Sequence, residues 1–298
     1  MRVMRVSIAL LLAVFTFGIA ALVNGQIQGD PKSYQKLVAL PLWAEFEGNK
    51  IHYYDLGNRK AKDALVFVHC WTCNVEFWKE NYMKFPNYRV IAMDLPGHGQ
   101  SDKPKVDYSM EFFARAVDAV MKKAGVNRAV LAGHSMGTPI TRKYYELYPS
   151  KTLGLIVVDG ALMPFGPRDQ VEKFFEPMFK DYKAGATTFV DGMLQTVHAE
   201  VRPFIRSSML ATPDYVGASA MQLMLDDSFA QHGRINVPVL AVMAKTDFWP
   251  VDLEQRYKDV APDLDFRMWT GVSHFLQLEK PAEFNAAVSE FISKKKLL

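Results

Sequence analysis

The sequence lacks the features that mark nucleic-acid-binding and metal-binding proteins. Its 35 lysines and arginines nearly balance its 32 aspartates and glutamates, so the formal net charge is only +3. Arg2 and Arg5 lie in an N-terminal segment without acidic residues, and the rest of the chain therefore carries +3 − 2 = +1. The sequence has no basic run with interleaved aromatic residues, and its histidines and acids lack the spacing of metal ligands. We therefore expect neither a nucleic-acid partner nor a bound metal.

Cysteine is scarce, and repeats are absent from the sequence. Cys70 and Cys73 are the only cysteines. Because neither follows the apolar N-terminal run directly, the sequence does not predict a lipid-anchored form. With 298 residues, 49% of them hydrophobic, the chain is long enough to bury a large core. This favours one domain carrying an elaboration.

The first 25 residues show the pattern of an export signal. Residues 1–5 are cationic, residues 6–23 are apolar apart from three positions, and small or tolerated residues precede Gln26. This pattern predicts a signal peptide over residues 1–25 and a secreted or periplasmic protein. The alternative is an uncleaved anchor, because the apolar run is nearly long enough to span a bilayer. That anchor would be the only membrane contact the sequence suggests.

Strand and helix patterns alternate over residues 40–161 and again over 233–298. Residues 43–47 and 51–56 are typical of a hairpin. Continuous apolar runs predict buried strands at 64–68, 88–93, 129–132, 153–158, 237–243 and 264–269. Helical periodicity occurs at 109–124, 139–148 and 281–294. The alternation predicts an α/β fold with a doubly wound, mostly parallel sheet, in which sites form at the carboxyl ends of the strands.

The regular alternation is interrupted between these two parts. Residues 162–232 have the pattern of several helices, which we expect at 170–182, 187–199 and 213–229. An all-helical insertion that follows a strand would lie over the carboxyl ends of the sheet. We therefore expect a helical cap, inserted into the core and covering its site.

The strand at 129–132 runs into Gly133-His134-Ser135-Met136-Gly137, a Gly-x-Ser-x-Gly sequence followed at once by a helical pattern. A serine on so sharp a turn takes strained backbone dihedrals, so the positions two before and two after it must lack bulk. Ser135 would then be exposed as a nucleophile, and the N–H of Met136 could donate to an oxyanion. His134 should point away on this turn, so we expect it to have a packing role.

The chain resembles an α/β-hydrolase-fold serine hydrolase with a helical cap, of the esterase and haloperoxidase-like branch. Four motifs carry the resemblance in the expected order: the His69 loop, residues 94–102, the Ser135 turn, and an acid followed by a histidine near the C-terminus. The resemblance implies that His274 is the general base, that Asp247 orients it, and that no cofactor is needed. Asp159 is the alternative acid, because some members of the fold place their acid after this earlier strand.

The family usually has His-Gly after the strand at 64–68, but this chain has His69-Cys70-Trp71. We expect the Trp71 N–H to be the second oxyanion donor, with the Cys70 N–H as the alternative. In an exported protein Cys70 and Cys73 could form a disulfide that stiffens this loop, or pack as unbonded thiols. A thioredoxin-like redox site is disfavoured, because the chain is organised around Ser135.

Apolar residues adjoin the expected catalytic positions, and few charged residues do. From the sequence we expect Phe248, Phe275, Phe165 and Met193 to line the substrate pocket. The expected substrate is a small molecule, an uncharged and moderately apolar carboxylic ester or lactone. The same triad could hydrolyse carbon–carbon or amide bonds, or carry out cofactor-free perhydrolysis. A ligand-binding protein on a hydrolase scaffold is the alternative outside the enzymes.

Overall fold

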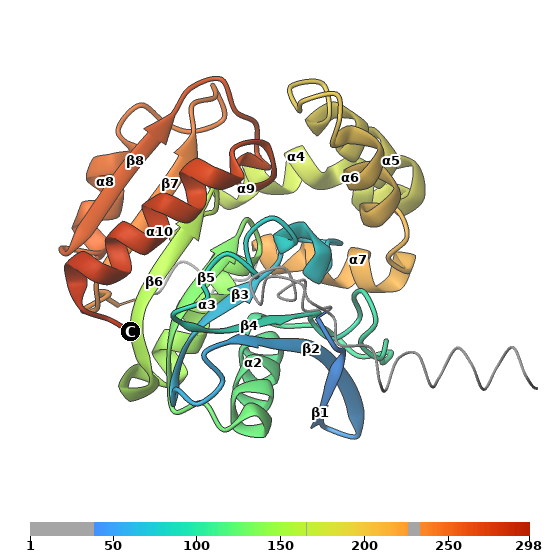
Figure 1. Ribbon diagram of the computed structural model, residues 1–298. Helices are drawn as coiled ribbons and strands as arrows, with labels where there is room; N and C mark the ends of the chain where they lie inside the picture. Colours follow the sequence, from blue (N-terminus) through green and yellow to red (C-terminus); the bar gives the residue numbers. More distant parts are fainter. Residues whose placement is uncertain (1–38, 165, 226–232) are drawn as a thin grey trace, which may run out of the picture. The chain divides into compact units, whose positions relative to one another are not determined.

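A sheet of eight strands lies at the centre of the residues that this computed structural model describes, which are 39–164, 166–225 and 233–298 (Figure 1). The strands are β1 (Leu42–Phe46), β2 (Asn49–Gly57), β3 (Asp63–Val68), β4 (Arg89–Met93), β5 (Arg128–His134), β6 (Thr152–Val158), β7 (Val239–Ala244) and β8 (Leu264–Trp269). Their spatial order is β1-β2-β4-β3-β5-β6-β7-β8. β1 and β2 form the predicted antiparallel hairpin, β2 is antiparallel to β4, and the remaining pairs are parallel.

Three predictions fall wholly or partly on residues outside this description. The expected signal peptide at 1–25 and the expected pocket residue Phe165 lie there, and so does the C-terminal end of the helix expected at 213–229. Within the described ranges, no helix combines the length and the apolar character needed to cross a membrane.

Helices cover both faces of the sheet, as the alternating pattern predicts. α2 (Met110–Ala124), α3 (Gly137–Leu147) and α8 (Leu253–Val260) pack on one face, and the short α9 (Leu276–Glu279) and α10 (Pro281–Lys295) pack on the other. Successive side chains of β3 alternate between the two cores: Val66 and Val68 belong to the first, and Leu65 and Phe67 to the second. Both faces of the central strands are therefore buried, which explains their continuous apolar sequences.

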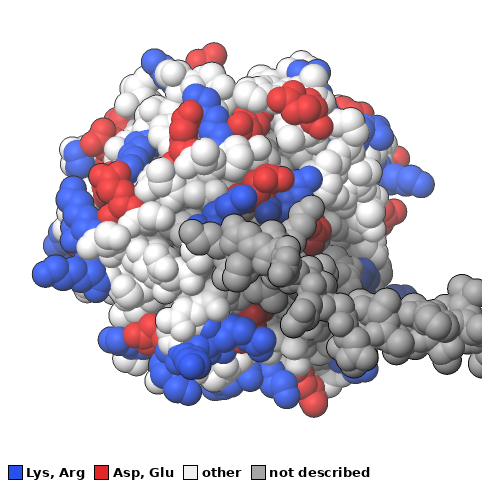
Figure 2. Space-filling model, viewed as in Figure 1, with Lys and Arg blue, Asp and Glu red and all other residues white. Residues whose placement is uncertain are grey.

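The predicted cap is present as helices between β6 and β7. Its described helices are α4 (Arg168–Lys180), α5 (Tyr182–Met193), α6 (Arg202–Met209) and α7 (Asp214–Met221), and the 3₁₀ turn η4 (Gln222–Leu225) follows them. Two further 3₁₀ turns lie outside the cap: η2 (Val75–Trp78) follows β3, and η3 (Pro149–Lys151) precedes β6. On the face drawn in Figure 2, cationic and anionic side chains both occur and are interspersed with uncharged areas.

Three helices escape the sequence prediction, namely α6, α8 and the four-residue α9, and α5 begins earlier than expected. α6 and α8 each have eight residues and bury only two large apolar side chains, one turn apart. Such a stripe is too short to give a periodic signal. α5 begins where the Asp181 carboxylate accepts the Ala184 N–H at 3.1 Å. This side-chain cap, and not the apolar pattern, sets the start of the helix.

Several histidines are buried in the core. His69, His98 and His134 are fully buried, and burial lowers the pKa of each below its ordinary value. For His98 the pKa falls to about 3, because of burial and then the neighbouring His69. These side chains are therefore neutral in the folded protein near pH 7.

This burial predicts an acid-sensitive fold. As pH falls below 6.5 the unfolded chain takes up a proton at His98, whereas the folded chain does so only near pH 3. The free energy of unfolding should therefore fall by about 1.4 kcal/mol per pH unit at this side chain. When the free energy of unfolding is measured with urea between pH 6 and pH 4, it should fall less steeply with falling pH in His98→Gln than in wild type. His198→Gln, at a partly exposed histidine, is the control and should keep the wild-type pH dependence. An equal pH dependence in His98→Gln and wild type would contradict the prediction.

Candidate active site

The turn after β5 holds Ser135 in a strained conformation. Its φ is 53°, in the left-handed region that non-glycine residues rarely adopt. A Cβ atom on Gly133 would collide with the backbone oxygen of Gly137, and one on Gly137 would collide with the backbone oxygen of Val68. Glycine is therefore required at both positions. The close approach of Gly137 to Val68 also brings the start of α3 against the loop that follows β3.

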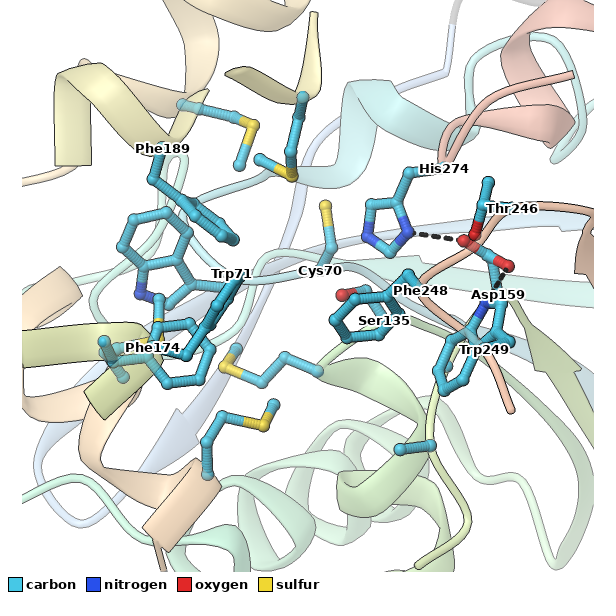
Figure 3. A pocket seen from close by; sticks show the side chains of 18 of the residues that line it. Cys70, Trp71, Ser135, Asp159, Phe174, Phe189, Thr246, Phe248, Trp249 and His274 are labelled. Carbon is cyan, nitrogen blue, oxygen red and sulfur yellow. Dashed lines mark hydrogen bonds and ion pairs between the residues drawn. The ribbon is translucent and has the colours of Figure 1, made fainter. Parts of the chain in front are cut away.

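The carboxylate of Asp159 faces the imidazole of His274. Asp159 directly follows β6, and its Oδ2 lies 2.6 Å from Nδ1 of His274 (Figure 3). Oδ1 accepts two further hydrogen bonds, from the Ala244 N–H at 2.9 Å and from the Trp249 indole N–H at 3.0 Å. Three donors therefore fix this carboxylate. The bond to Nδ1 places the proton of a neutral His274 on that nitrogen and leaves Nε2 as the basic atom.

The prediction that Asp247 orients His274 is wrong. Asp247 lies in an exposed turn three residues beyond the end of β7, and the structure gives His274 a different carboxylate partner. Asp159, the alternative weighed from the sequence, takes the position because it directly follows β6, the strand next to β7, and has a positive φ of 39°. Its backbone N–H donates to Val242 of β7 at 2.9 Å, and its side chain receives the Ala244 N–H from the end of the same strand.

The loop after β3 lies beside Ser135, as expected. Cys70, Trp71, Ser135 and Met136 all line one cavity. Within the described residues, neither the Trp71 N–H nor the Met136 N–H donates a backbone hydrogen bond. Both are therefore available to an oxyanion, the role expected of them from the sequence. The side chain of Trp71 is occupied elsewhere, since its indole N–H donates to the carbonyl of Gly217 in α7 at 2.8 Å.

Cys70 and Cys73 form a disulfide within this loop. Of the two arrangements left open by the sequence, the bonded pair is the one found. The departure from the usual glycine is accommodated because the positive φ of the loop falls on Thr72, at 53°, and not on Cys70. The carbonyl of Thr72 accepts the Thr212 hydroxyl at 3.0 Å, which anchors the loop to the cap.

His134 connects the serine turn to the histidine loop. Burial, and then the neighbouring His274, lower the pKa of His134 well below its ordinary value, so its ring is neutral. Its Nε2 lies 2.8 Å from the carbonyl oxygen of His274, and its Nδ1 lies 3.2 Å from the amide nitrogen of Gln277. The Gln277 amide donates to Nδ1, so Nδ1 is the acceptor and the ring proton lies on Nε2. The Nε2–H therefore donates a hydrogen bond to the carbonyl oxygen of His274. A packing role was expected for His134, and this bond fixes the backbone that carries His274.

The cavity shared by Ser135 and His274 has a volume of about 270 Å³ and an apolar wall. Among the described residues that line it, Asp159 and His274 are the only titratable side chains. The aromatic and methionine residues of the wall are Trp71, Met136, Phe174, Phe175, Phe189, Met193, Met209, Met221, Met224, Phe248 and Trp249. Figure 3 shows Phe174 and Phe189 at one end of this cavity and Asp159, His274 and Trp249 at the other.

Some of the residues expected to line the pocket do so, and one does not. Met193 and Phe248 line the cavity. Phe275 does not, because its fully buried ring packs against Phe77 and His134 in the core. Sequence reasoning missed Phe174 and Phe189. Their signal was the aromatic content of the cap helices, which does not distinguish core positions from pocket positions.

Comparison with known proteins agrees with this geometry. The family model described as "alpha/beta hydrolase fold" matches residues 63–213, just over half of the chain. The chain belongs to the α/β-hydrolase fold family. The resemblance inferred from the sequence motifs is therefore confirmed.

Relatives within the α/β-hydrolase family have several activities. The 2-hydroxy-6-oxononadienedioate/2-hydroxy-6-oxononatrienedioate hydrolase of Paraburkholderia phymatum is 26% identical over 273 residues, which cover 82% of this chain and 91% of that protein. The solved structure of Est816, an N-acyl homoserine lactone degrading enzyme, is 27% identical, covers 84% of this chain and 100% of its own, and has a TM-score of 0.69. A bromoperoxidase from Bacillus anthracis, 18% identical with a TM-score of 0.73, shows the shared fold alone.

Mutation of the two competing aspartates tests the geometry of this α/β-hydrolase site. Asp159→Asn should lower kcat for 4-nitrophenyl butyrate by about 10³- to 10⁴-fold, because His274 loses the partner that fixes its tautomer and stabilises its charged form. Asp247→Asn is the matched control and should leave kcat close to wild type. Steady-state kinetics on both variants decide which aspartate acts on His274. A larger loss of kcat in Asp247→Asn than in Asp159→Asn would contradict the assignment of Asp159.

The disulfide gives a second prediction. Its sequence separation is only three residues, so removing it should cost about 2 kcal/mol of unfolding free energy or less. In the double variant Cys70→Ala/Cys73→Ala the N–H of Trp71 should be less well fixed, and kcat should fall about tenfold, a part of what one lost oxyanion donor costs. Thermal unfolding and ester kinetics measure the two effects. A wild-type kcat in the folded variant would show that the bond does not position the donor.

Proposed function

We propose that this protein is a serine hydrolase that cleaves uncharged, moderately apolar carboxylic esters or lactones. The observation that carries the proposal is the bond between Asp159 and His274, at one wall of a cavity that Ser135 also lines. A serine that lines the cavity, an oriented imidazole and a fixed carboxylate are the three groups that nucleophilic acyl transfer requires.

The proposed reaction proceeds through an acyl-enzyme. Ser135 Oγ attacks the substrate carbonyl carbon while Nε2 of His274 takes the hydroxyl proton. The N–H groups of Met136 and Trp71 stabilise the tetrahedral oxyanion, and Asp159 stabilises the imidazolium. His274 then donates its proton to the leaving alcohol oxygen. In the second half, His274 takes a proton from water as the water oxygen attacks the acyl carbon. His274 then returns that proton to Ser135 Oγ as the ester bond to Ser135 breaks and the carboxylic acid leaves.

The charge of the cavity wall favours neutral substrates. The relative from Paraburkholderia phymatum acts, by its name, on dioates, which carry two carboxylates. The part of the cavity wall that the structure describes contains no lysine or arginine to pair with such groups. An unpaired carboxylate moved out of water costs several kcal/mol. Ester or lactone hydrolysis is therefore favoured over carbon–carbon cleavage of a dianion.

The size of the cavity favours small acyl groups. Its volume of about 270 Å³ lies just below the range typical for drug-sized ligands, which is about 300–1,000 Å³. Five methionines in the wall give a flexible apolar surface that can adapt to different acyl chains. An N-acyl homoserine lactone, the class named for Est816, is an uncharged lactone with an acyl tail and belongs among the first substrates to test.

We also propose that the protein is exported. The N-terminal pattern of residues 1–25 supports export, and so does the disulfide between Cys70 and Cys73, because such bonds persist in oxidising compartments and are rare in the cytosol. Edman sequencing of the protein purified from its own host, with Gln26 or a near neighbour as the first residue, tests this part of the proposal.

A pair of esters of similar acyl shape tests the substrate class. 4-Nitrophenyl butyrate should be cleaved with a burst, whereas the hemisuccinate ester, which ends in a carboxylate, should show a kcat/KM lower by about 100-fold or more, because its charge finds no partner in the cavity. The methyl ester of the hemisuccinate restores neutrality and should recover activity.

Two controls accompany this assay. Ser135→Ala should abolish both the burst and the turnover. Folded wild-type protein that binds apolar ligands without cleaving any ester or lactone would contradict the proposal and favour a binding scaffold. Equal rates on the charged and neutral esters would contradict only the substrate class.

A further inference from the structure

A fully buried arginine lies at the base of the cap. Arg142 is on α3, in the helix that follows Ser135, and only 1% of its side chain is exposed. Among the described residues, Arg142 forms its ion pair with Glu146, whose Oε1 lies 3.7 Å from the Arg142 Nε. Burial lowers the pKa of Arg142 to about 10, with Glu146 opposing the shift, so the guanidinium remains charged at neutral pH. A buried charge with so loose an ion pair is costly to maintain.

The two ends of the guanidinium bind two carbonyls that are far apart in the sequence. Nη1 donates to the carbonyl of Leu162, and Nη2 donates to the carbonyl of Gly233 at 2.9 Å. Leu162 lies between β6 and α4, where the chain leaves the core to form the cap. Gly233 lies before β7, where the chain has returned. One side chain therefore joins both connections of the cap to the core.

The Leu162 connection is also part of the active site. Asp159, Gly160 and Ala161 line the catalytic cavity and directly precede Leu162. A shift of the Leu162 carbonyl would therefore move the cavity wall within three residues of the carboxylate that faces His274. Such small displacements at a reaction centre have large effects on rate.

Other bonds hold the cap independently of Arg142. The Tyr257 hydroxyl donates to the carbonyl of Gly160 at 2.6 Å, and the Trp71 indole donates to Gly217 of α7 at 2.8 Å. On the returning side, the N–H of Asn236 donates to the hydroxyl of Tyr145, also on α3, at 3.0 Å. Loss of Arg142 should therefore displace the cap, and not release it.

We infer that Arg142 is a positioning residue that fixes both cap connections and thereby sets the dimensions of the substrate cavity. The inference about substrate selection rests on the proposed ester hydrolysis, whereas the clamp itself does not. Arginine suits this role because its planar fork carries donors at both ends. Lysine, a single point charge on a flexible stem, cannot bind both carbonyls in the same way.

The experiment compares Arg142→Lys and Arg142→Gln with wild type on 4-nitrophenyl acetate and octanoate. We expect kcat/KM for octanoate to fall about tenfold more than kcat/KM for acetate, because the longer chain reaches further along the cavity wall. The pH dependence of kcat for acetate should not change, since Asp159 and His274 keep their contact. Lys143→Gln removes the neighbouring cation that pairs with Glu146 and is the matched control, expected to behave as wild type.

Hydrogen exchange gives a readout that does not depend on activity. Peptides that span residues 159–164 and 214–225 should exchange about tenfold faster in both Arg142 variants, with core strands unchanged. If wild type cleaved no ester, the proposed function would fail while exchange still tested the clamp. An equal loss on both esters with unchanged exchange, or wild-type selectivity and exchange in both folded variants, would overturn the inference.

Discussion

The site depends on one steric constraint, the close packing of the turn after β5. Gly133 and Gly137 have backbone neighbours so near that no side chain fits at either position, and Ser135 between them is held at a φ of 53°. The same contact presses the start of α3 against the end of β3. One tight turn therefore brings the hydroxyl of Ser135, the N–H of Met136 and the loop that carries Trp71 to one place.

The remaining groups reach this place because parallel strands end at one edge of the sheet. β5, β6 and β7 are neighbours, and β8 follows at the edge. Asp159 directly follows β6, and His274 lies in the loop after β8, so a carboxylate and an imidazole from separate segments meet beside Ser135. The buried, neutral His134 completes the assembly, since its hydrogen bond to the His274 carbonyl connects the loop that carries His274 to the turn that carries Ser135.

Much of this arrangement could be predicted from the sequence, and one part of it could not. The glycines around Ser135 reflect local sterics, so the five residues 133–137 are enough to predict Ser135 as a nucleophile on a strand–turn–helix connection. The choice between Asp159 and Asp247 depends instead on two neighbouring strand ends, and both residues follow predicted strands. What decides it is a set of long-range donors to the carboxylate, among them the Trp249 indole, which sequence order does not reveal.

The cap shows the same limit. Its helical character is visible in the sequence, whereas the division of its aromatic residues between core and cavity is not. Phe275, placed next to His274 by the sequence, packs into the core, and Phe189, 86 residues before Phe275, lines the cavity. Arg142 likewise has no signal in the pattern of α3, because its partners are backbone carbonyls at both ends of the inserted segment.

The central claim is that Ser135 is a nucleophile activated by His274 and Asp159. The most direct measurement is to treat the protein with an alkyl 4-nitrophenyl phosphonate and to map the adduct by peptide mass spectrometry. We predict a single adduct on Ser135, formed at wild-type rate in Asp247→Asn and much more slowly in Asp159→Asn. An adduct on another residue, or labelling of Ser135 that does not depend on Asp159, would contradict the account.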